Sequence, residues 1–423
     1  MTVKTSPVGK PLDRVDGPLK VQGQAKYAGE FALPNMLYGH IVNATITRGR
    51  ILQIDTHAAQ AVPGIEAILT HENRPPIASY DKPYEDDDAA DGSPFRPLFN
   101  DRILYNSQPI ALVVGESLEL ARYAASLIKV EYEAEEHATD LLTNLDQMSK
   151  APADLPGPRG DAKQALNNAA CKVEVQYTTP VEHHNPMEPH ASTVHYLSDG
   201  TLEVYDKTQG VQNGMRYLED VFDMEGQIRI LTPFVGGAFG SGLRPQHQLP
   251  LAVMAALKLK RSVRVSFARQ QMFTFGYRPR SIQRLTIGAS LDGQLEAIHH
   301  QAIAQTSRFE DYTEQQVEWS GMLYKCPNVT LDYQLVPLDV YTPLDMRAPG
   351  GTIGVYALEC ALDELAYAAN IDPVELRQKN FTDFNANEGK PYSSKALLEC
   401  YEQDADRCRS YGLSDGSGGV QVG

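Results

Sequence analysis

A glycine-rich segment, residues 234–244 with the sequence FVGGAFGSGLR, is the first candidate for chemistry in this chain. Glycines let a ligand approach the backbone closely, and successive amide groups can then bind an anion or an oxo group. The segment lacks the G-K-[ST] ending of a P-loop, and Gly237, Gly240 and Gly242 do not have the G-x-G-x-x-G spacing. A binding loop and a tight connection that needs positive φ angles both stay open as interpretations.

Three histidines and two glutamates lie within residues 182–190, EHHNPMEPH. This composition suggests a metal site, and a zinc hydrolase that uses His183, His184 and His190 is one hypothesis. The spacing fits no helical metal motif, because two prolines exclude the helix that H-E-x-x-H requires. Hydrogen-bonded loop histidines are the other interpretation.

Two arginines lie in turn-like segments. Arg347 belongs to residues 345–351, DMRAPGG, directly before a predicted helix. An arginine at such a helix entrance suits an oxyanion, a phosphate or a carbonyl group, and a surface arginine that caps the turn is the alternative. Arg278 lies in YRPR, where it could hold a carboxylate or phosphate, but the residues alone favour an exposed basic turn. There is no G-x-S-x-G nucleophile motif, and the apolar surroundings of Cys360 are typical of a core residue.

Charge and cysteine content exclude several classes of protein. The chain has 423 residues and a formal net charge of −16, which argues against a nucleic-acid or anionic-membrane partner. Its five cysteines form no C-x-x-C pair, so an iron–sulfur or zinc-ribbon site within the chain has no support. Their sparse, odd number favours a reducing compartment. The N-terminus does not resemble a signal peptide, and no apolar run approaches the length of a membrane span.

The elements that must position these residues suggest a mixed α/β chain with two domains. An extended arm (residues 1–19) precedes an α/β domain (20–136), and a linker (137–168) leads to a second α/β domain (169–409). A Gly/Ser-rich tail (410–423) follows. Residues 79–100, which include the EDDD run, are predicted to form a long exposed loop. The strands and helices predicted with the clearest signals are strands 109–114, 129–133, 172–177, 202–205, 227–231 and 262–267, a helix starting at Ser117, and helices 250–259, 355–370 and 373–380, the last capped by Asp372.

Together these segments resemble the molybdenum-binding large subunit of the xanthine dehydrogenase/aldehyde oxidase family. They look most like the bacterial three-subunit aldehyde oxidoreductases. The resemblance covers about residues 9–408, and the order and spacing of its short pieces carry it. Those pieces are GKPLDRVDGPLKVQGQAKYA (9–28), residues 44–67 ending in PGIEA, SQPIALVV (107–114), MEPHAS (187–192), GGAFG (236–240), YRP (277–279), MRAPG (346–350), ALECALDELA (357–366) and IDPVELR (371–377).

The resemblance implies a fold and a set of site residues. The fold would be mixed α/β, with an α/β hammerhead domain followed by the first molybdopterin-binding domain. The resemblance implies no side-chain ligand for the metal, because in this family the pterin holds the molybdenum. It implies that Leu243 and Arg278 line the substrate pocket, and Leu243 replaces a purine-binding glutamate, which favours an aldehyde over xanthine. The cofactor-binding residues would be Gln209, Gly237, Phe239, Gly240 and Arg347.

The resemblance also implies cofactors, partners and chemistry. The cofactor would be molybdopterin with molybdenum, in its cytosine dinucleotide form, and iron–sulfur clusters and FAD would belong to two partner subunits. The reaction would oxidise aldehydes or N-heterocycles to acids with oxygen from water. A cytoplasmic location is expected, with periplasmic co-export on a signal-bearing partner as the alternative.

The family's subunit continues for about three hundred residues beyond this chain, into a second molybdopterin-binding domain that supplies the general-base glutamate. The resemblance therefore implies a C-terminally truncated chain to which no catalytic residue can be assigned. The competing hypothesis is a non-catalytic remnant or assembly fragment that keeps the fold without the cofactor.

Overall fold

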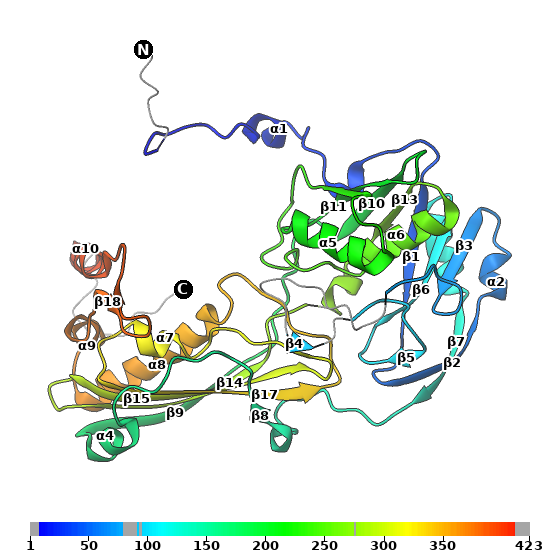
Figure 1. The fold of residues 1–423 in the computed structure, drawn as a ribbon. Helices are drawn as coiled ribbons and strands as arrows, with labels where there is room; N and C mark the ends of the chain where they lie inside the picture. Colours follow the sequence, from blue (N-terminus) through cyan, green and yellow to red (C-terminus); the bar gives the residue numbers. More distant parts are fainter. Residues whose placement is uncertain (1–7, 79–90, 93–94, 275, 411–423) are drawn as a thin grey trace, which may run out of the picture. The chain divides into compact units, whose positions relative to one another are not determined.

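The computed structural model describes residues 8–78, 91–92, 95–274 and 276–410, and shows two compact units, each assembled from separate segments of the chain (Figure 1). The first unit contains residues 1–89, 93–136 and 184–275. The second contains the remainder, mainly residues 137–183 and 276–423. The sequence assigned residues 184–275 to the second domain, so the compact units and the sequence-based domains divide the chain at different points.

A seven-stranded mixed sheet forms the centre of the first unit, and it explains this grouping. β13 pairs in parallel with β1, with Leu37 opposite Val263, so a strand from the middle of the chain lies beside the first strand. β6 is buried along its whole length between β1 and β3. In spatial order the strands are β12 (Ile228–Leu231), β11 (Leu202–Asp206), β10 (Ala191–Tyr196), β13 (Val263–Ser266), β1 (Leu37–Asn43), β6 (Pro109–Gly115) and β3 (Ile65–Thr70).

Helices with apolar faces cover this sheet. α6 (Gln248–Leu259) packs on β10 and β13 and is almost wholly buried. α3 (Leu118–Ser126) packs on β1 and β6, and the Ser117 side chain accepts a hydrogen bond from the Leu120 amide, which confirms the predicted start of this helix. α5 (Val211–Phe222), which the sequence analysis missed, packs on β12. The unit also contains α1 (Gly17–Val21), α2 (His57–Gln60) and a small sheet of β5 (Arg102–Ile103), β2 (Gly49–Asp55) and β7 (Lys129–Ala134).

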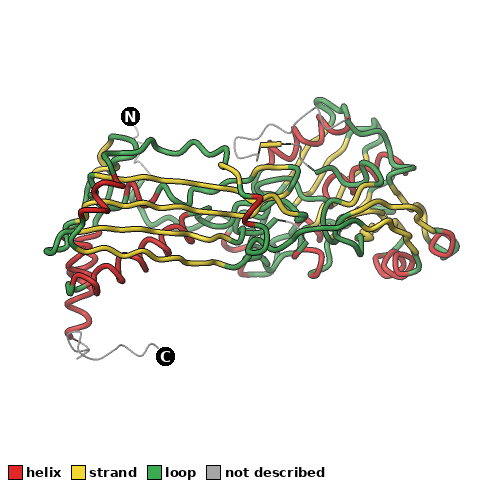
Figure 2. The backbone as a smooth tube through the Cα atoms, turned by 90° about the horizontal axis from the view of Figure 1, so that it is seen from below, coloured by secondary structure: helices red, strands yellow, loops and turns green. Residues whose placement is uncertain are grey.

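A five-stranded sheet forms the centre of the second unit, and its long strands lie side by side in Figure 2. β15 pairs with β14 in antiparallel and with β17 in parallel orientation. The sequence analysis did not identify these three strands. In spatial order the sheet contains β8 (Ser149–Lys150), β17 (Asn328–Leu338), β15 (Leu295–Ser307), β14 (Ser281–Ala289) and β9 (Cys171–Thr179).

Helices lie on both faces of this second sheet (Figure 1). α8 (Gly351–Ala369) packs its buried Leu358, Ala361 and Leu365 against apolar side chains of β14 and β15. α4 (Ala162–Asn168) packs through Ala162 and Leu166 against Ala297. The other elements of the unit are α7 (Trp319–Met322), α9 (Pro373–Lys379), α10 (Leu397–Ser410) and the short pairs β16 (Glu310–Asp311) with β4 (Asp91–Gly92) and β18 (Phe384–Asn385) with β19 (Lys390–Pro391).

Several predicted elements can be compared with this fold. Asp372 caps α9 through its carboxylate, as predicted. The predicted linker contains α4 and β8 and belongs to the second unit, because Arg159 donates hydrogen bonds to the Cys326 carbonyl. The loop predicted to be exposed is buried at Phe95, Arg96 and Leu98, and its EDDD run lies outside the described residues, as does tail segment 411–423. In the described part of the chain, no helix is both long and apolar enough to cross a membrane.

Candidate cofactor site

The glycine loop, residues 234–244, lies between β12 and α6 in the first unit. Its backbone adopts positive φ angles of 95° at Gly237, 59° at Phe239 and 110° at Gly240, so the predicted need for positive φ is confirmed. Phe239 is the unusual member, because a non-glycine residue in this region carries strain, and such strain often marks a functional site. Phe239 is 48% exposed. The loop therefore holds an aromatic side chain out of the core at a fixed place.

Gln209 holds the centre of the glycine loop. Its Oε1 accepts hydrogen bonds from the amides of Gly240 (3.0 Å) and Gly242 (3.3 Å), and its own amide donates to the Gly242 carbonyl (2.7 Å). Gln209 lies three residues beyond the end of β11 and is exposed. Among the described residues, neither its side-chain Nε2 nor the Phe239 amide has a hydrogen-bond partner. Two donors at this edge of the loop are thus open to a ligand.

The E-H-H-N-P-M-E-P-H segment supports the same loop from another side. Glu188 Oε2 accepts a hydrogen bond from the Gly236 amide at 2.6 Å, and His190 Nε2 lies 3.2 Å from the Ser241 hydroxyl. Burial lowers the pKa of His190 well below its usual range, so this ring is neutral. Nowhere in the described residues does a group of three or more His, Cys, Asp or Glu side chains have an arrangement that could hold a metal ion. The zinc hydrolase hypothesis has no ligand set there, and the interpretation as hydrogen-bonded loop residues fits His190.

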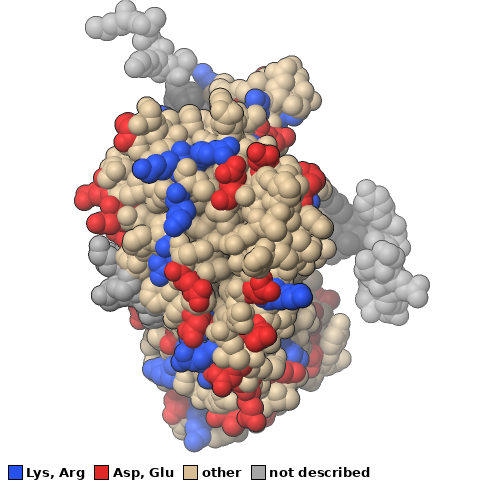
Figure 3. Space-filling view, turned by 90° about the vertical axis from the view of Figure 1, so that its right-hand side faces the viewer, with Lys and Arg blue, Asp and Glu red and all other residues tan. Residues whose placement is uncertain are grey.

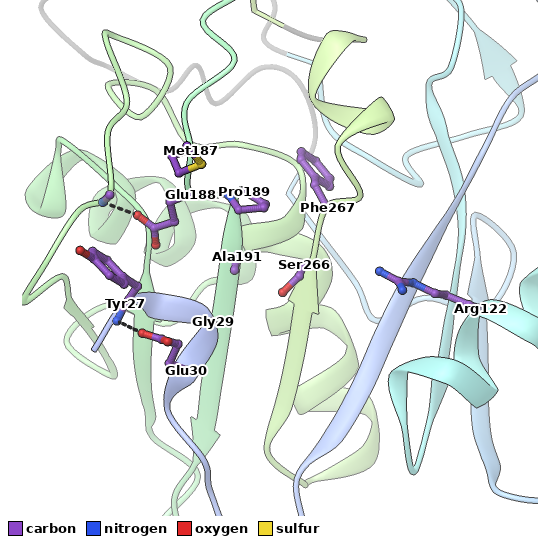
Figure 4. A pocket seen from close by; sticks show the side chains of 11 residues that line it. Tyr27, Gly29, Glu30, Arg122, Met187, Glu188, Pro189, Ala191, Ser266 and Phe267 are labelled. Carbon is purple, nitrogen blue, oxygen red and sulfur yellow. Dashed lines mark hydrogen bonds between the residues drawn. The ribbon is translucent and has the colours of Figure 1, made fainter. Parts of the chain in front are cut away.

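A cavity of about 560 Å³ borders the glycine loop at Gly236. Figure 4 shows Glu188 and Tyr27 together at one side and Phe267, Ser266 and Arg122 at the other. Burial raises the pKa of Glu188, and the charge of Lys207 opposes that rise. The sequence analysis did not predict this cavity, because Tyr27, Glu188 and Ser266 come from segments far apart in the chain.

A buried polar cluster lies at the end of β11, where the chain turns toward Gln209. Lys207 is 1% exposed, and its Nζ has no hydrogen-bond partner among the described residues. Burial lowers its pKa to about 8, while the charges of Glu188 and Asp206 act in the opposite direction. Burial also raises the pKa of Asp206 to about 6, although Ser192 donates a hydrogen bond to its carboxylate. Sequence reasoning missed this cluster.

The two predicted arginines lie close together in the second unit. Arg278 is only 4% exposed, so the exposed turn favoured by the residues alone is wrong. Its guanidinium pairs with Glu182 and donates to the carbonyls of Met346 and Arg347, both at 3.1 Å. Arg347 itself is exposed, and its guanidinium makes no hydrogen bond or ion pair with the described residues. Arg278 is thus occupied with protein groups, whereas the charge of Arg347 is available.

The predicted site residues therefore form two groups. Gln209, Gly237, Phe239, Gly240 and Leu243 lie together in the first unit, where the Leu243 amide donates to the Gly240 carbonyl and its side chain is half-buried. Arg278 and Arg347 form the second group, in the second unit. The open groups of the first set are hydrogen-bond donors, and the open group of the second set is a cation. Each kind of group suits an anionic, oxygen-bearing ligand.

Comparisons with known proteins identify two domain families in this chain. Residues 148–381 match the molybdopterin cofactor-binding domain family, and residues 22–136 match the a/b hammerhead domain of aldehyde oxidase and xanthine dehydrogenase. The chain therefore belongs to the molybdopterin cofactor-binding family of aldehyde oxidase and xanthine dehydrogenase. Its fold is the predicted mixed α/β fold, with a hammerhead domain followed by a molybdopterin-binding domain.

Individual relatives give the extent of the similarity. The aldehyde oxidoreductase molybdenum-binding subunit PaoC of Escherichia coli K12 is 36% identical over 408 residues, which cover 95% of this chain and 54% of PaoC. The xanthine dehydrogenase molybdenum-binding subunit of Escherichia coli O157:H7 is 28% identical, over 92% of this chain and 54% of that protein. The aldehyde oxidoreductase of Desulfovibrio gigas has the same fold, with a TM-score of 0.82 at 21% identity over 96% of this chain and 47% of that one. The chain spans about half the length of these relatives.

Proposed function

We propose that this chain binds the molybdenum cofactor through the glycine loop, Gln209 and Arg347. The observation that carries the proposal is the geometry of Gln209, whose Oε1 fixes the Gly240 and Gly242 amides while its Nε2 stays open. A fixed loop loses little entropy when it binds, so its donors are worth more to a ligand. Gln209 Nε2 and the Phe239 amide would donate to oxygen atoms of the cofactor, and Arg347 would neutralise part of its negative charge.

We propose further that the complete enzyme oxidises aldehydes to acids, or hydroxylates N-heterocycles, with water as the source of oxygen. When bound, the cofactor would supply the two-electron oxidation and the activated oxygen. Leu243 supports an aldehyde, because an apolar side chain offers a purine no hydrogen bond. Phe239 would present an apolar surface and help to exclude bulk water from the substrate.

The proposal extends to the assembly. We expect the cytosine dinucleotide form of molybdopterin, with an iron–sulfur subunit and an FAD subunit as partners that carry the electrons away. PaoC supports a separate molybdenum-binding subunit, since its name describes it as one. We place the complex in the cytoplasm, and export to the periplasm with a signal-bearing partner is the alternative. The face in Figure 3 carries acidic side chains among the basic ones, which supports the expectation of no nucleic-acid partner.

The direct test is to produce the chain in cells that make the cofactor and to measure bound molybdenum and pterin. We expect both to co-purify with the chain, and Gln209→Ala to retain at least about tenfold less, because it loses hydrogen bonds to a charged group. Gln53→Ala, which replaces an exposed glutamine on β2, is the matched control and should retain the wild-type amount. Molybdenum far below one equivalent in the folded wild-type chain would instead support an assembly fragment that binds no cofactor.

A further inference from the structure

The segment that carries Arg347 is held in an unusual conformation. We call residues 345–350 the arginine loop; it leads into α8 (Gly351–Ala369). Ala348 and Gly350 adopt positive φ angles of 57° and 69°. Ala348 has a Cβ, so its conformation is strained and requires surrounding contacts to maintain it. The contacts that hold the loop therefore decide where the exposed guanidinium of Arg347 lies.

Arg278 holds the carbonyl side of the arginine loop. One nitrogen of its guanidinium donates to the Met346 and Arg347 carbonyls at 3.1 Å and to the Thr352 hydroxyl at 3.2 Å. Another nitrogen pairs with Glu182. The Arg278 side chain is 5% exposed, so these are buried, charge-assisted hydrogen bonds, which are stronger than neutral ones.

Glu314 holds the amide side of the same loop. Its Oε2 accepts a hydrogen bond from the Gly350 amide at 3.1 Å, and its Oε1 accepts one from the Tyr312 hydroxyl at 3.2 Å. Glu314 is 4% exposed. The backbone of Gly350 packs directly against the backbone of Gln315, because a Cβ on Gly350 would lie 2.3 Å from it.

A role in stability alone does not explain these charges. Burying a carboxylate costs free energy even when it is paired, and an apolar side chain of similar volume often gives an equally stable protein. Asp345 increases this cost, because it shares the Tyr312 hydroxyl with Glu314 and its negative charge helps to raise the pKa of Glu314 to about 7, after the larger effect of burial. Arg278 acts in the opposite direction through its positive charge. Two costly buried groups thus meet the two sides of one short, strained loop.

We propose that Arg278 and Glu314 are positioning residues that grip the arginine loop from opposite sides and so fix Arg347 for ligand binding. Arg278 fixes two consecutive carbonyls, and Glu314 fixes the amide of Gly350, the residue directly before α8. This gives Arg278 a role through Arg347 in place of direct substrate contact. The importance of Arg347 to the cofactor rests on the proposed function, but the grip itself can be tested without any cofactor.

The test uses the Arg347–Ala348 peptide bond, which trypsin can cut only when the arginine loop leaves its present conformation. The full chain is digested under native conditions, and mass spectrometry follows fragments 1–347 and 348–423. We expect Glu314→Met and Arg278→Met to accelerate this cut at least about tenfold, because each removes a buried side chain that is hydrogen-bonded to the backbone of the loop. Glu314→Gln keeps an acceptor for the Gly350 amide and should cut at nearly the wild-type rate.

Glu359→Met is the matched control. Glu359 lies on a later turn of α8 than the arginine loop and forms an ion pair with Arg377 of α9 at 2.6 Å. It should leave the cut within about twofold of wild type, and urea unfolding of each variant separates loop opening from global unfolding. The proposal requires acceleration in Glu314→Met even where global stability is unchanged. A wild-type cutting rate in Glu314→Met, or equal acceleration in Glu359→Met, would overturn it.

A second measurement separates this proposal from the proposed function. The same variants are produced with the cofactor, and bound molybdenum is measured. Faster cutting together with weaker cofactor retention supports both. Faster cutting with unchanged retention supports the proposal that Arg278 and Glu314 hold the loop, and it overturns the role of Arg347 in binding the cofactor.

Discussion

At the scale of single residues, Lys207 is the most informative side chain outside the predicted site. Its ammonium group is buried at the end of β11 without a hydrogen-bond partner among the described residues. Burial lowers its pKa to about 8 from an ordinary 10.5, so folding weakens proton binding at this residue. Between these two pH values the unfolded state holds more protons, and the free energy of unfolding therefore rises with pH. At neutral pH the charged lysine destabilises the folded chain.

Lys207→Met should therefore stabilise the chain at pH 7. We expect the free energy of unfolding to increase by about 1–2 kcal/mol, less than the full pKa shift suggests because Glu188 and Asp206 lose a counter-charge. The gain should shrink as pH approaches 10.5. Urea unfolding at pH 7 and at pH 9.5 measures both effects, with Lys163→Met on the exposed face of α4 as the control. A loss of more than about 1 kcal/mol at pH 7 would show that Lys207 is needed as a counter-charge.

The sequence could predict some of the site at this scale and not the rest. The glycines at 237 and 240 predict positive φ angles, because other residues rarely adopt them. The family resemblance alone selected Gln209, whereas the Pro-Gly-Gly turn before a predicted helix already made Arg347 a candidate. Nothing local indicates that Arg278 is buried, since its partners Glu182 and Met346 lie about one hundred residues before it and seventy after it.

At the scale of elements, the first turn of α8 shows how closely the second unit is packed. A Cβ on Gly354 would lie 1.9 Å from the Gln316 carbonyl oxygen, so the helix can approach this backbone only because residue 354 is glycine. Gly214 in α5 differs, because a Cβ there would meet only the flexible ends of two side chains, Ile230 at 3.0 Å and Leu249 at 3.8 Å. Two helical glycines thus provide a matched pair.

Gly354→Ala should destabilise the chain even though alanine is the better helix former. Propensity alone predicts a gain of about 1 kcal/mol, and overpacking against a backbone atom should turn it into a loss of about 2–3 kcal/mol. Gly214→Ala should change stability by about 1 kcal/mol or less, because a side chain can move where a carbonyl cannot. Urea unfolding of both variants checks the contrast. Equal effects at the two positions would contradict the packing argument.

The elements that the sequence predicted share a local signal, and the missed ones lack it. Ser117 and Asp372 predict the starts of α3 and α9, because their side chains cap the first turns of these helices. β15 (Leu295–Ser307) has no such signal, because it is buried on both faces and does not alternate between apolar and polar residues. The polar residues His299, His300 and Gln301 interrupt its apolar pattern further. Only its pairing with β14 and β17 makes it a strand, and a local pattern does not show such pairing.

At the scale of the whole molecule, charge and exposed apolar surface have opposite effects on association. The net charge of −16 makes copies of the chain repel one another. The N-terminal arm favours association, because it exposes apolar side chains. Val15 is 99% exposed, Val8 and Val21 are nearly as exposed, and α1 buries no residue. Exposed apolar side chains gathered on one segment favour association. We infer that any self-association of this chain depends on the arm and increases with salt, which screens the repulsion.

Deleting residues 2–23 should therefore leave the fold intact and reduce self-association. The deletion removes the cation–π contact of Lys20, whose Nζ lies 5.7 Å from the ring centre of Phe234, and the hydrogen bonds from the Gln24 and Ala25 amides to the Leu19 carbonyl. The cation–π contact is worth about 0.5–1 kcal/mol at an exposed position, and water can replace the Leu19 carbonyl at the new chain end, so the melting temperature should fall by only about 1–2 °C. Sedimentation velocity at 0.5 M salt should then show fewer oligomers than in the full chain. Val15→Ser with Val21→Ser in the full-length arm should have the same effect, because it removes apolar surface without shortening the chain. A fall of more than about 5 °C would mean that the arm packs on the folded chain.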